Sequence, residues 1–211
     1  MLELVETDVT VAGVRLSLLR PPDAEALIDE ARFDVDEFLP YWAELWPSAF
    51  ALAEEVARRD VSGLQIVELG CGLALPSLVA AVRGAHVLAT DWAEEAVELL
   101  GRNASRNRIR LDALRVDWRA PEPLLARAPF DLVVAADVLY ERRYVDLLLD
   151  LLPRLGHSVL LADPGRPFTG RFLERAAESW SVERVAKTLY ALERYEAVTA
   201  SGSGDGSTAT G

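Results

Sequence analysis

Residues 65–74 read Gln-Ile-Val-Glu-Leu-Gly-Cys-Gly-Leu-Ala, a short apolar run followed by a glycine-rich turn. The run at 65–69 has the length and composition of a buried strand, and residues 76–83 after the turn have helical spacing. Gly70 and Gly72 permit a tight turn and a close approach to bare backbone, and the first N–H groups of the following helix lack partners within the helix. This stretch predicts a strand, a ligand-binding turn and a helix. A compact turn without a ligand is the alternative.

The same alternation of apolar runs and amphipathic stretches continues along the chain, as is typical of strand-helix units around a parallel sheet. Further strands are expected at 86–90, 111–116, 130–136 and 158–162, and further helices at 93–107, 142–152 and 170–180. Residues 182–198 have strand character with a break near 190–193, which predicts an antiparallel pair at the end of the sheet. The expected fold is α/β: a doubly wound, Rossmann-like sheet of seven strands, mostly parallel, with an antiparallel last strand.

The N-terminal residues have a different pattern. Residues 9–18 have strand propensity around Gly13, which predicts a β-hairpin, and residues 48–59 have helical spacing behind Ser48 as a candidate N-cap. Residues 201–211 contain no large apolar side chain, so a disordered tail is expected. The predicted division is an N-terminal hairpin with an acidic connector, an α/β domain and a tail, at residues 1–39, 40–199 and 200–211.

Composition narrows the class of protein. The chain has 211 residues, 51% of them hydrophobic, enough for a substantial core. Its formal net charge of −12 opposes phosphate binding, so no nucleic-acid partner is expected. One cysteine and two histidines exclude a disulfide framework and argue against a zinc site, and no metal is expected. No apolar run approaches the length that spans a bilayer, and the acidic start does not resemble a signal peptide. The predicted location is the cytoplasm.

In a doubly wound sheet, ligands bind beyond the carboxyl ends of the strands. Asp91 ends the second predicted strand about 20 residues after Gly72, the separation at which an acid accepts hydrogen bonds from ribose hydroxyls. Asp117 and Trp118 follow the third strand and combine an acceptor for an exocyclic amine with a broad apolar ring. A turn with a packed tryptophan is the alternative for this pair. Together these residues predict a site for a nucleoside cofactor.

Asp137 ends the fourth predicted strand directly after apolar residues, a costly place for a charge without a partner. It is the leading candidate for a functional carboxylate, and an N-cap for the helix that begins near Glu141 is the alternative. Tyr140, three residues later, can line a narrow channel for an amine or serve as a half-buried anchor. Arg166 follows the fifth strand and either recognises substrate or pairs with an acid.

Four segments together resemble the successive motifs of the class I, seven-stranded S-adenosylmethionine-dependent methyltransferases: Glu68-Leu-Gly-Cys-Gly72, Asp91, Asp117-Trp118 and Asp137-Val-Leu-Tyr140. The resemblance covers roughly residues 40 to 198. More narrowly, three segments resemble the protein lysine methyltransferase branch, closest to the enzymes that modify the electron-transfer flavoprotein beta subunit: Pro40-Tyr-Trp-Ala-Glu-Leu-Trp-Pro47, Asp137-Val-Leu-Tyr140 and Ala162-Asp-Pro-Gly-Arg-Pro167.

The resemblance implies a role for each matching residue toward S-adenosylmethionine. On the methionine side, Glu68 orients the loop and the amino group, and the moiety is faced by Gly70, Gly72 and the ring of Trp46. On the nucleoside side, the ribose is held by Asp91, and the adenine by Asp117 with a ring from Trp92 or Trp118. The position that is often a third glycine is Ala74, which keeps a small residue but makes the loop less permissive.

The expected activity is methyl transfer to lysine side chains of a protein substrate by direct in-line displacement, with Asp137 orienting the amine and Tyr140 lining its channel. The resemblance makes the electron-transfer flavoprotein beta subunit a candidate partner. A small-molecule N- or O-methyltransferase and a catalytically silent cofactor-binding protein remain alternatives. A nicotinamide-dependent dehydrogenase is disfavoured, because the chain lacks room for a second substrate domain. Cys71 has no base evident in the sequence, so packing beneath the cofactor is favoured over a nucleophilic role.

Overall fold

The computed structural model describes residues 3–24, 27 and 40–195. The predicted tail and most of the predicted acidic connector lie outside these residues. Within them, no helix combines the length and the apolar composition needed to cross a membrane.

The centre of the molecule is a seven-stranded sheet with the order β5-β4-β3-β6-β7-β9-β8. The parallel strands are β3 (Gln65–Leu69), β4 (His86–Asp91), β5 (Asp112–Arg115), β6 (Leu132–Ala136) and β7 (Ser158–Ala162). The antiparallel strands are β8 (Trp180–Ala186) and β9 (Leu189–Arg194). The predicted fold class is confirmed. The predicted break near 190–193 is wrong, because β8 and β9 turn at Lys187 and Thr188 and residues 190–193 lie inside β9.

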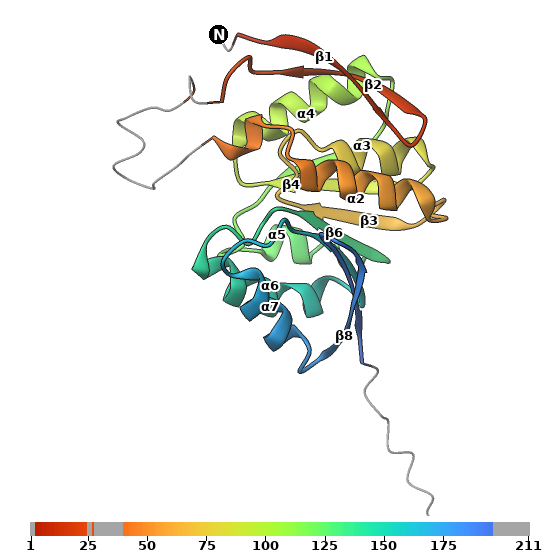
Figure 1. The fold of residues 1–211 in the computed structure, drawn as a ribbon. Helices are drawn as coiled ribbons and strands as arrows, with labels where there is room; N and C mark the ends of the chain where they lie inside the picture. Colours follow the sequence, from red (N-terminus) through yellow and green to blue (C-terminus); the bar gives the residue numbers. More distant parts are fainter. Residues whose placement is uncertain (1–2, 25–26, 28–39, 196–211) are drawn as a thin grey trace, which may run out of the picture.

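Within the described residues, helices cover both faces of the sheet, as Figure 1 shows. One face carries α2 (Pro47–Arg58), α3 (Leu75–Val82) and α4 (Glu94–Arg106), and the other carries α5 (Glu122–Leu125), α6 (Arg142–Leu155) and α7 (Thr169–Ala176). The side chains of β3 alternate between these layers, with Ile66 in a cluster with α2 and α3, and Val67 and Leu69 in the cluster with α5, α6 and α7. Both faces are therefore buried, as the continuous apolar strands require.

The start of α2 differs from the prediction. The helix begins at Pro47, where the missing N–H of proline costs little, and its N-cap is Trp46 without a side-chain cap. Ser48 is buried in the first turn, so its predicted role as N-cap is wrong. The sequence pattern also missed α5, whose four residues are too few to show a helical period.

Strand order reverses between β3 and β6, since the chain builds outward through β4 and β5 before it returns to the other side of β3. Leu69 and Ala135 are register partners in this parallel pair. The turn after β3 and the turn after β6 therefore leave the sheet side by side. This is the switch point at which doubly wound folds bind ligands.

The predicted hairpin is formed by β1 (Val5–Val11) and β2 (Val14–Arg20) and lies outside α4 in Figure 1. Its turn residues Ala12 and Gly13 both have positive φ, 47° and 82°, as a tight hairpin turn of matching twist requires. One face of the hairpin is buried in a cluster with residues of α2, α3 and α4.

The outer edge of β2 is hydrogen-bonded by two asparagine side chains, Asn103 in α4 and Asn107 at the C-cap of α4. The N–H of Leu19 donates to Asn103 Oδ1 at 2.7 Å, and Asn103 Nδ2 donates to the Leu19 carbonyl at 3.0 Å. Asn107 makes the same two contacts with Ser17, at 2.8 and 2.9 Å. Four helical residues rise about 6 Å and two strand residues about 6.6 Å, so the two spacings match. The asparagines substitute for a third strand.

We expect Asn103→Ala to destabilise the protein by about 1–3 kcal/mol, because it leaves the N–H and the carbonyl of Leu19 without partners. Urea unfolding measures the change, with Arg102→Ala at an exposed position of the same helix as the control. Equal stability of the two variants would contradict this account of how the hairpin is held.

Candidate functional site

A cavity opens at the carboxyl ends of β3, β4, β5 and β6. Ten of the predicted site residues line it: Trp46, Glu68, Gly70, Gly72, Asp91, Trp92, Asp117, Trp118, Asp137 and Tyr140. Arg166 is not among the lining residues of the described chain. The structure also places in the wall several residues that the sequence did not single out: Tyr41, Arg119, Glu141, Arg143 and Tyr144.

The glycine loop needs its glycines for two reasons. Gly70 and Gly72 have left-handed backbones, with φ of 63° and 51°. A Cβ on Gly72 would stand 3.0 Å from the carbonyl oxygen of Trp42, and one on Gly70 would stand 3.1 Å from the Val138 side chain. Ala74, at the position of the third glycine, is also left-handed with φ 56°, a conformation that costs a non-glycine residue about 1–2 kcal/mol. An alanine at this position therefore strains the loop.

Glu68 lies beneath this loop and is buried. Its Oε2 accepts the backbone N–H of Ser77 at 2.9 Å and the hydroxyl of the same residue. These bonds tie the end of β3 to the first turn of α3. Burial raises the pKa of Glu68 to about 8, so the carboxyl group is largely protonated at neutral pH in the cofactor-free protein.

Asp91 joins the glycine loop to the end of β4. Its Oδ2 accepts the N–H of Gly72 and its Oδ1 the N–H of Ala93, each at 2.9 Å. Burial raises the pKa of this carboxyl group as well. Each carboxylate oxygen can accept a second hydrogen bond, so the side chain can hold the loop and still receive ligand hydroxyls.

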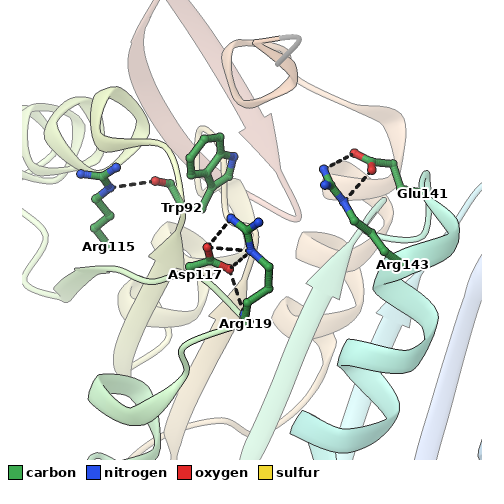
Figure 2. A network of polar contacts seen from close by, with 6 residues as sticks. All are labelled: Trp92, Arg115, Asp117, Arg119, Glu141 and Arg143. Atoms are coloured by element: carbon green, nitrogen blue, oxygen red, sulfur yellow. Dashed lines mark hydrogen bonds and ion pairs between the residues drawn. The ribbon is translucent and has the colours of Figure 1, made fainter. Parts of the chain in front are cut away.

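Asp117 forms an ion pair with Arg119 (Figure 2), a residue that the sequence did not single out. Arg119 Nε lies 3.0 Å from Oδ1 and 2.9 Å from Oδ2, and its Nη2 lies 2.6 Å from Oδ2. These bonds lower the pKa of Asp117 and keep it ionised. Trp92 stands beside the pair, and Arg143 with its partner Glu141 lies across from it.

Five aromatic rings form a continuous row along the wall. The centroids are 6.0 Å apart for Trp46 and Tyr41, 5.1 Å for Tyr41 and Tyr140, 5.0 Å for Tyr140 and Tyr144, and 5.4 Å for Tyr144 and Trp118. Burial raises the pKa of Tyr140, so its hydroxyl stays neutral, 3.4 Å from the hydroxyl of Tyr144. Helical spacing could not have identified Tyr144 from Tyr140, because Tyr140 lies before the helix predicted at 142–152 and before α6.

Asp137 is buried with a left-handed backbone, φ 60°, directly after β6. The N-cap of α6 is Glu141, so the alternative of Asp137 as an N-cap is wrong. Instead, Arg166 Nε donates to Oδ1 at 2.7 Å and Nη2 donates to Oδ2 at 3.1 Å. Of the two alternatives for Arg166, the structure shows the pairing with an acid.

Asp163 fixes the loop that carries Arg166. Its Oδ1 accepts the backbone N–H groups of Gly165 and Arg166, both at 2.8 Å, and the hydroxyl of Thr169. The guanidinium carbon of Arg166 lies 5.5 Å from the ring centroid of Trp46, within cation–π range. The motif at 162–167 thus builds a support for one arginine.

The described residues give little support to a metal site or to a nucleophilic cysteine. They contain no group of three or more histidine, cysteine, aspartate or glutamate side chains arranged to hold a metal ion. Cys71 is buried, and burial raises the pKa of its thiol, which disfavours the reactive thiolate.

A family model described as lysine methyltransferase matches residues 42–162, more than half of the chain. The chain belongs to this lysine methyltransferase family. The match covers the site segments described above except Tyr41, directly before it, and the Arg166 loop, which begins where the match ends. Membership confirms the predicted recognition.

Two curated relatives differ in the acceptor that they are named for. The electron transfer flavoprotein beta subunit lysine methyltransferase of Xenopus laevis is 35% identical over 136 residues, which are 60% of this chain and 53% of that protein. The histone-arginine methyltransferase METTL23 of the same organism is 31% identical over 150 residues, 68% of this chain and 62% of that protein. The chain thus spans about half to three-fifths of the relatives' length.

Among solved structures, the T. thermophilus 16S rRNA N2 G1207 methyltransferase in complex with AdoMet and guanosine has a TM-score of 0.67 at 17% identity. The similarity covers 91% of this chain and 51% of that one. At this identity it supports the fold alone. This similarity agrees with the predicted class I fold. Family membership agrees with the predicted cofactor, S-adenosylmethionine.

We expect Glu68→Gln to flatten the pH dependence of stability in the cofactor-free protein. With a pKa of about 8 when folded against an ordinary 4.5, Glu68 keeps a proton that the unfolded chain releases. The free energy of unfolding therefore falls as pH rises through this window, by up to about 1.4 kcal/mol per pH unit, and glutamine removes the fall.

Urea unfolding at about pH 5.5 and about pH 7.5 measures the effect. Glu178→Gln, at an exposed position, controls for the loss of one carboxyl group. Equal pH slopes for wild type and Glu68→Gln would overturn the assignment.

Proposed function

We propose that this protein transfers the methyl group of S-adenosylmethionine to a lysine side chain of a protein substrate. The observation that carries the proposal is one cavity in which the glycine loop, Asp91 and Asp117 meet an aromatic wall and the carboxylate of Asp137. Family membership supports the reaction class.

The residues present fit the cofactor. Gly70 and Gly72 leave bare backbone at the loop, and Glu68 beside them can ionise to meet an ammonium group. Asp91 has lone pairs left for ribose hydroxyls. Both oxygens of Asp117 already accept hydrogen bonds from Arg119, so the adenine amine would replace one of these bonds, with Trp92 or Trp118 against the ring. The predicted roles of these residues, and of Trp46 on the methionine side, are part of this proposal. When bound, the cofactor supplies a methyl group on a cationic sulfur.

Positioning is the main task of the remaining residues. Methyl transfer to nitrogen is an in-line displacement, so the site must align the acceptor and strip it of water. The faces of the aromatic row attract a cationic side chain, and Asp137 offers it a charge-assisted hydrogen bond. A lysine of ordinary pKa, about 10.4, must release a proton to solvent before its nitrogen attacks the methyl group. The neutral hydroxyl of Tyr140 can accept a hydrogen bond from the acceptor as it enters.

The identity of the protein substrate is a separate proposal from the reaction. The lysine methyltransferase relative is named for the electron transfer flavoprotein beta subunit, which makes that protein the first candidate partner. The family disfavours the small-molecule alternative. The cytoplasmic location stays a prediction from the sequence.

A screen for methyl acceptors tests the proposed function. Labelled S-adenosylmethionine is incubated with wild-type enzyme and a cell extract, and protein and small-molecule products are separated. Label in protein, mapped to lysine by mass spectrometry, is the expected result. Label confined to small molecules, or no enzyme-dependent label, would overturn it.

Asp91→Asn should weaken cofactor binding about tenfold or more, because it removes the charge and an acceptor while keeping the shape. Calorimetric titration with S-adenosylhomocysteine measures the affinity. Thermal unfolding without ligand shows whether the bonds to Gly72 and Ala93 have survived. Undiminished affinity in a folded variant would exclude Asp91 as the ribose acceptor.

Asp137→Asn should keep cofactor affinity but reduce single-turnover methyl transfer by at least about 100-fold, since the amine loses its charged partner. Rapid-quench measurement on the mapped lysine substrate separates binding from transfer. Near-wild-type transfer would remove Asp137 from the catalytic site. Joint loss of folding and binding would show a structural role.

A further inference from the structure

The relatives include enzymes named for lysine and for arginine acceptors, so similarity to them does not explain why this site would prefer lysine. We propose that Arg166 makes this site selective for lysine over arginine by occupying the two-oxygen fork of Asp137. The inference rests on the proposed function and deepens it. Arg166 is a positioning residue that acts through the Asp137 carboxylate.

The geometry of the pair is a guanidinium fork. Arg166 places one N–H on each oxygen of Asp137, at 2.7 Å and 3.1 Å. A carboxylate offers about four lone-pair sites, and a guanidinium that binds both oxygens takes the two that point the same way. The two sites that remain, one on each oxygen, diverge.

This arrangement suits a lysine acceptor better than an arginine acceptor. An arginine acceptor is held best by two parallel N–H bonds to one carboxylate, and that geometry is already used. A lysine ammonium is a compact charge that needs only one acceptor oxygen, which a diverging lone pair supplies. Asp137 lines the cavity and Arg166 does not, so the open lone pairs are the ones that an acceptor in the cavity can reach.

The fork is held in place from several sides. The backbone N–H of Arg166 is fixed by Asp163, which also binds Gly165 and Thr169. The guanidinium lies against the ring of Trp46 at 5.5 Å. The Asp137 side chain is only 5% exposed. An incoming arginine cannot displace the Arg166 guanidinium without breaking its two bonds to Asp137 and its contact with Trp46.

The test compares acceptor preference rather than activity. Two peptides span the lysine mapped in the acceptor screen, one with the natural lysine and one with arginine at that position. The ratio of kcat/KM for the two peptides is measured for wild type, Arg166→Gln and Arg166→Lys. Arg175→Gln is the matched control, because Arg175 pairs with Asp146 on the outer side of α6 and α7.

Wild type and Arg175→Gln should methylate the lysine peptide and leave the arginine peptide nearly untouched. Arg166→Gln frees the fork, so the lysine-to-arginine ratio should fall by about tenfold or more. Arg166→Lys occupies one oxygen and should give an intermediate ratio. Binding of S-adenosylhomocysteine and the unfolding temperature confirm that each variant is folded.

The outcomes separate the two proposals. A loss of activity by the same factor on both peptides, in Arg166→Gln and in Arg166→Lys, would show a structural role only and overturn the inference. An acceptor screen that yields no labelled lysine would overturn the proposed function and the inference with it, whereas equal kcat/KM of wild type for the two peptides would overturn the inference alone. If Arg166→Gln does not fold, the ratio for Arg166→Lys decides.

Discussion

The site depends on the loop at residues 70–74, in which Gly70, Gly72 and Ala74 have left-handed backbones and which buried carboxyl groups hold from two sides. Asp91 binds the N–H of Gly72 from β4, and Glu68 binds the first turn of the following helix from β3. Because the loop has no side chains at its two glycines, the Trp42 backbone and the Val138 side chain approach it closely. Segments from both sides of the switch point therefore converge on one loop, and the cavity is the space they leave.

Four buried acids lie at this edge of the sheet: Glu68, Asp91, Asp137 and Asp163. The cost of burying them is offset in three ways. Glu68 is largely protonated, two of the others accept backbone N–H groups, and Asp137 has an arginine partner. Burial of charge is costly unless it is compensated, so such a concentration is expected where a protein must meet polar and cationic ligand groups. The aromatic row adds a surface that attracts a cation without a further carboxylate.

Particular residues show how far sequence reasoning reaches. Asp91, Asp117 and Asp137 were identified because each ends an apolar strand, and parallel strands end at one edge. Arg119 and Tyr41 were missed because their positions in exposed or turn segments give no periodic signal. The two interpretations of Arg166 could not be separated, since its partner lies 29 residues away. Only the adjacency of β6 and β7 brings the two side chains together.

The sequence by itself determined the fold class, the strand ends that supply the site and the family, because apolar periodicity and motif spacing are local properties of the chain. Tertiary structure decided which groups pair: Arg166 with Asp137, and Asn103 and Asn107 with β2. It brought five aromatic rings into one row. It also decided the protonation of Glu68, which depends on how completely the surrounding layers exclude water. These properties depend on contacts between segments that are far apart in the sequence. Such contacts form only when the layers pack.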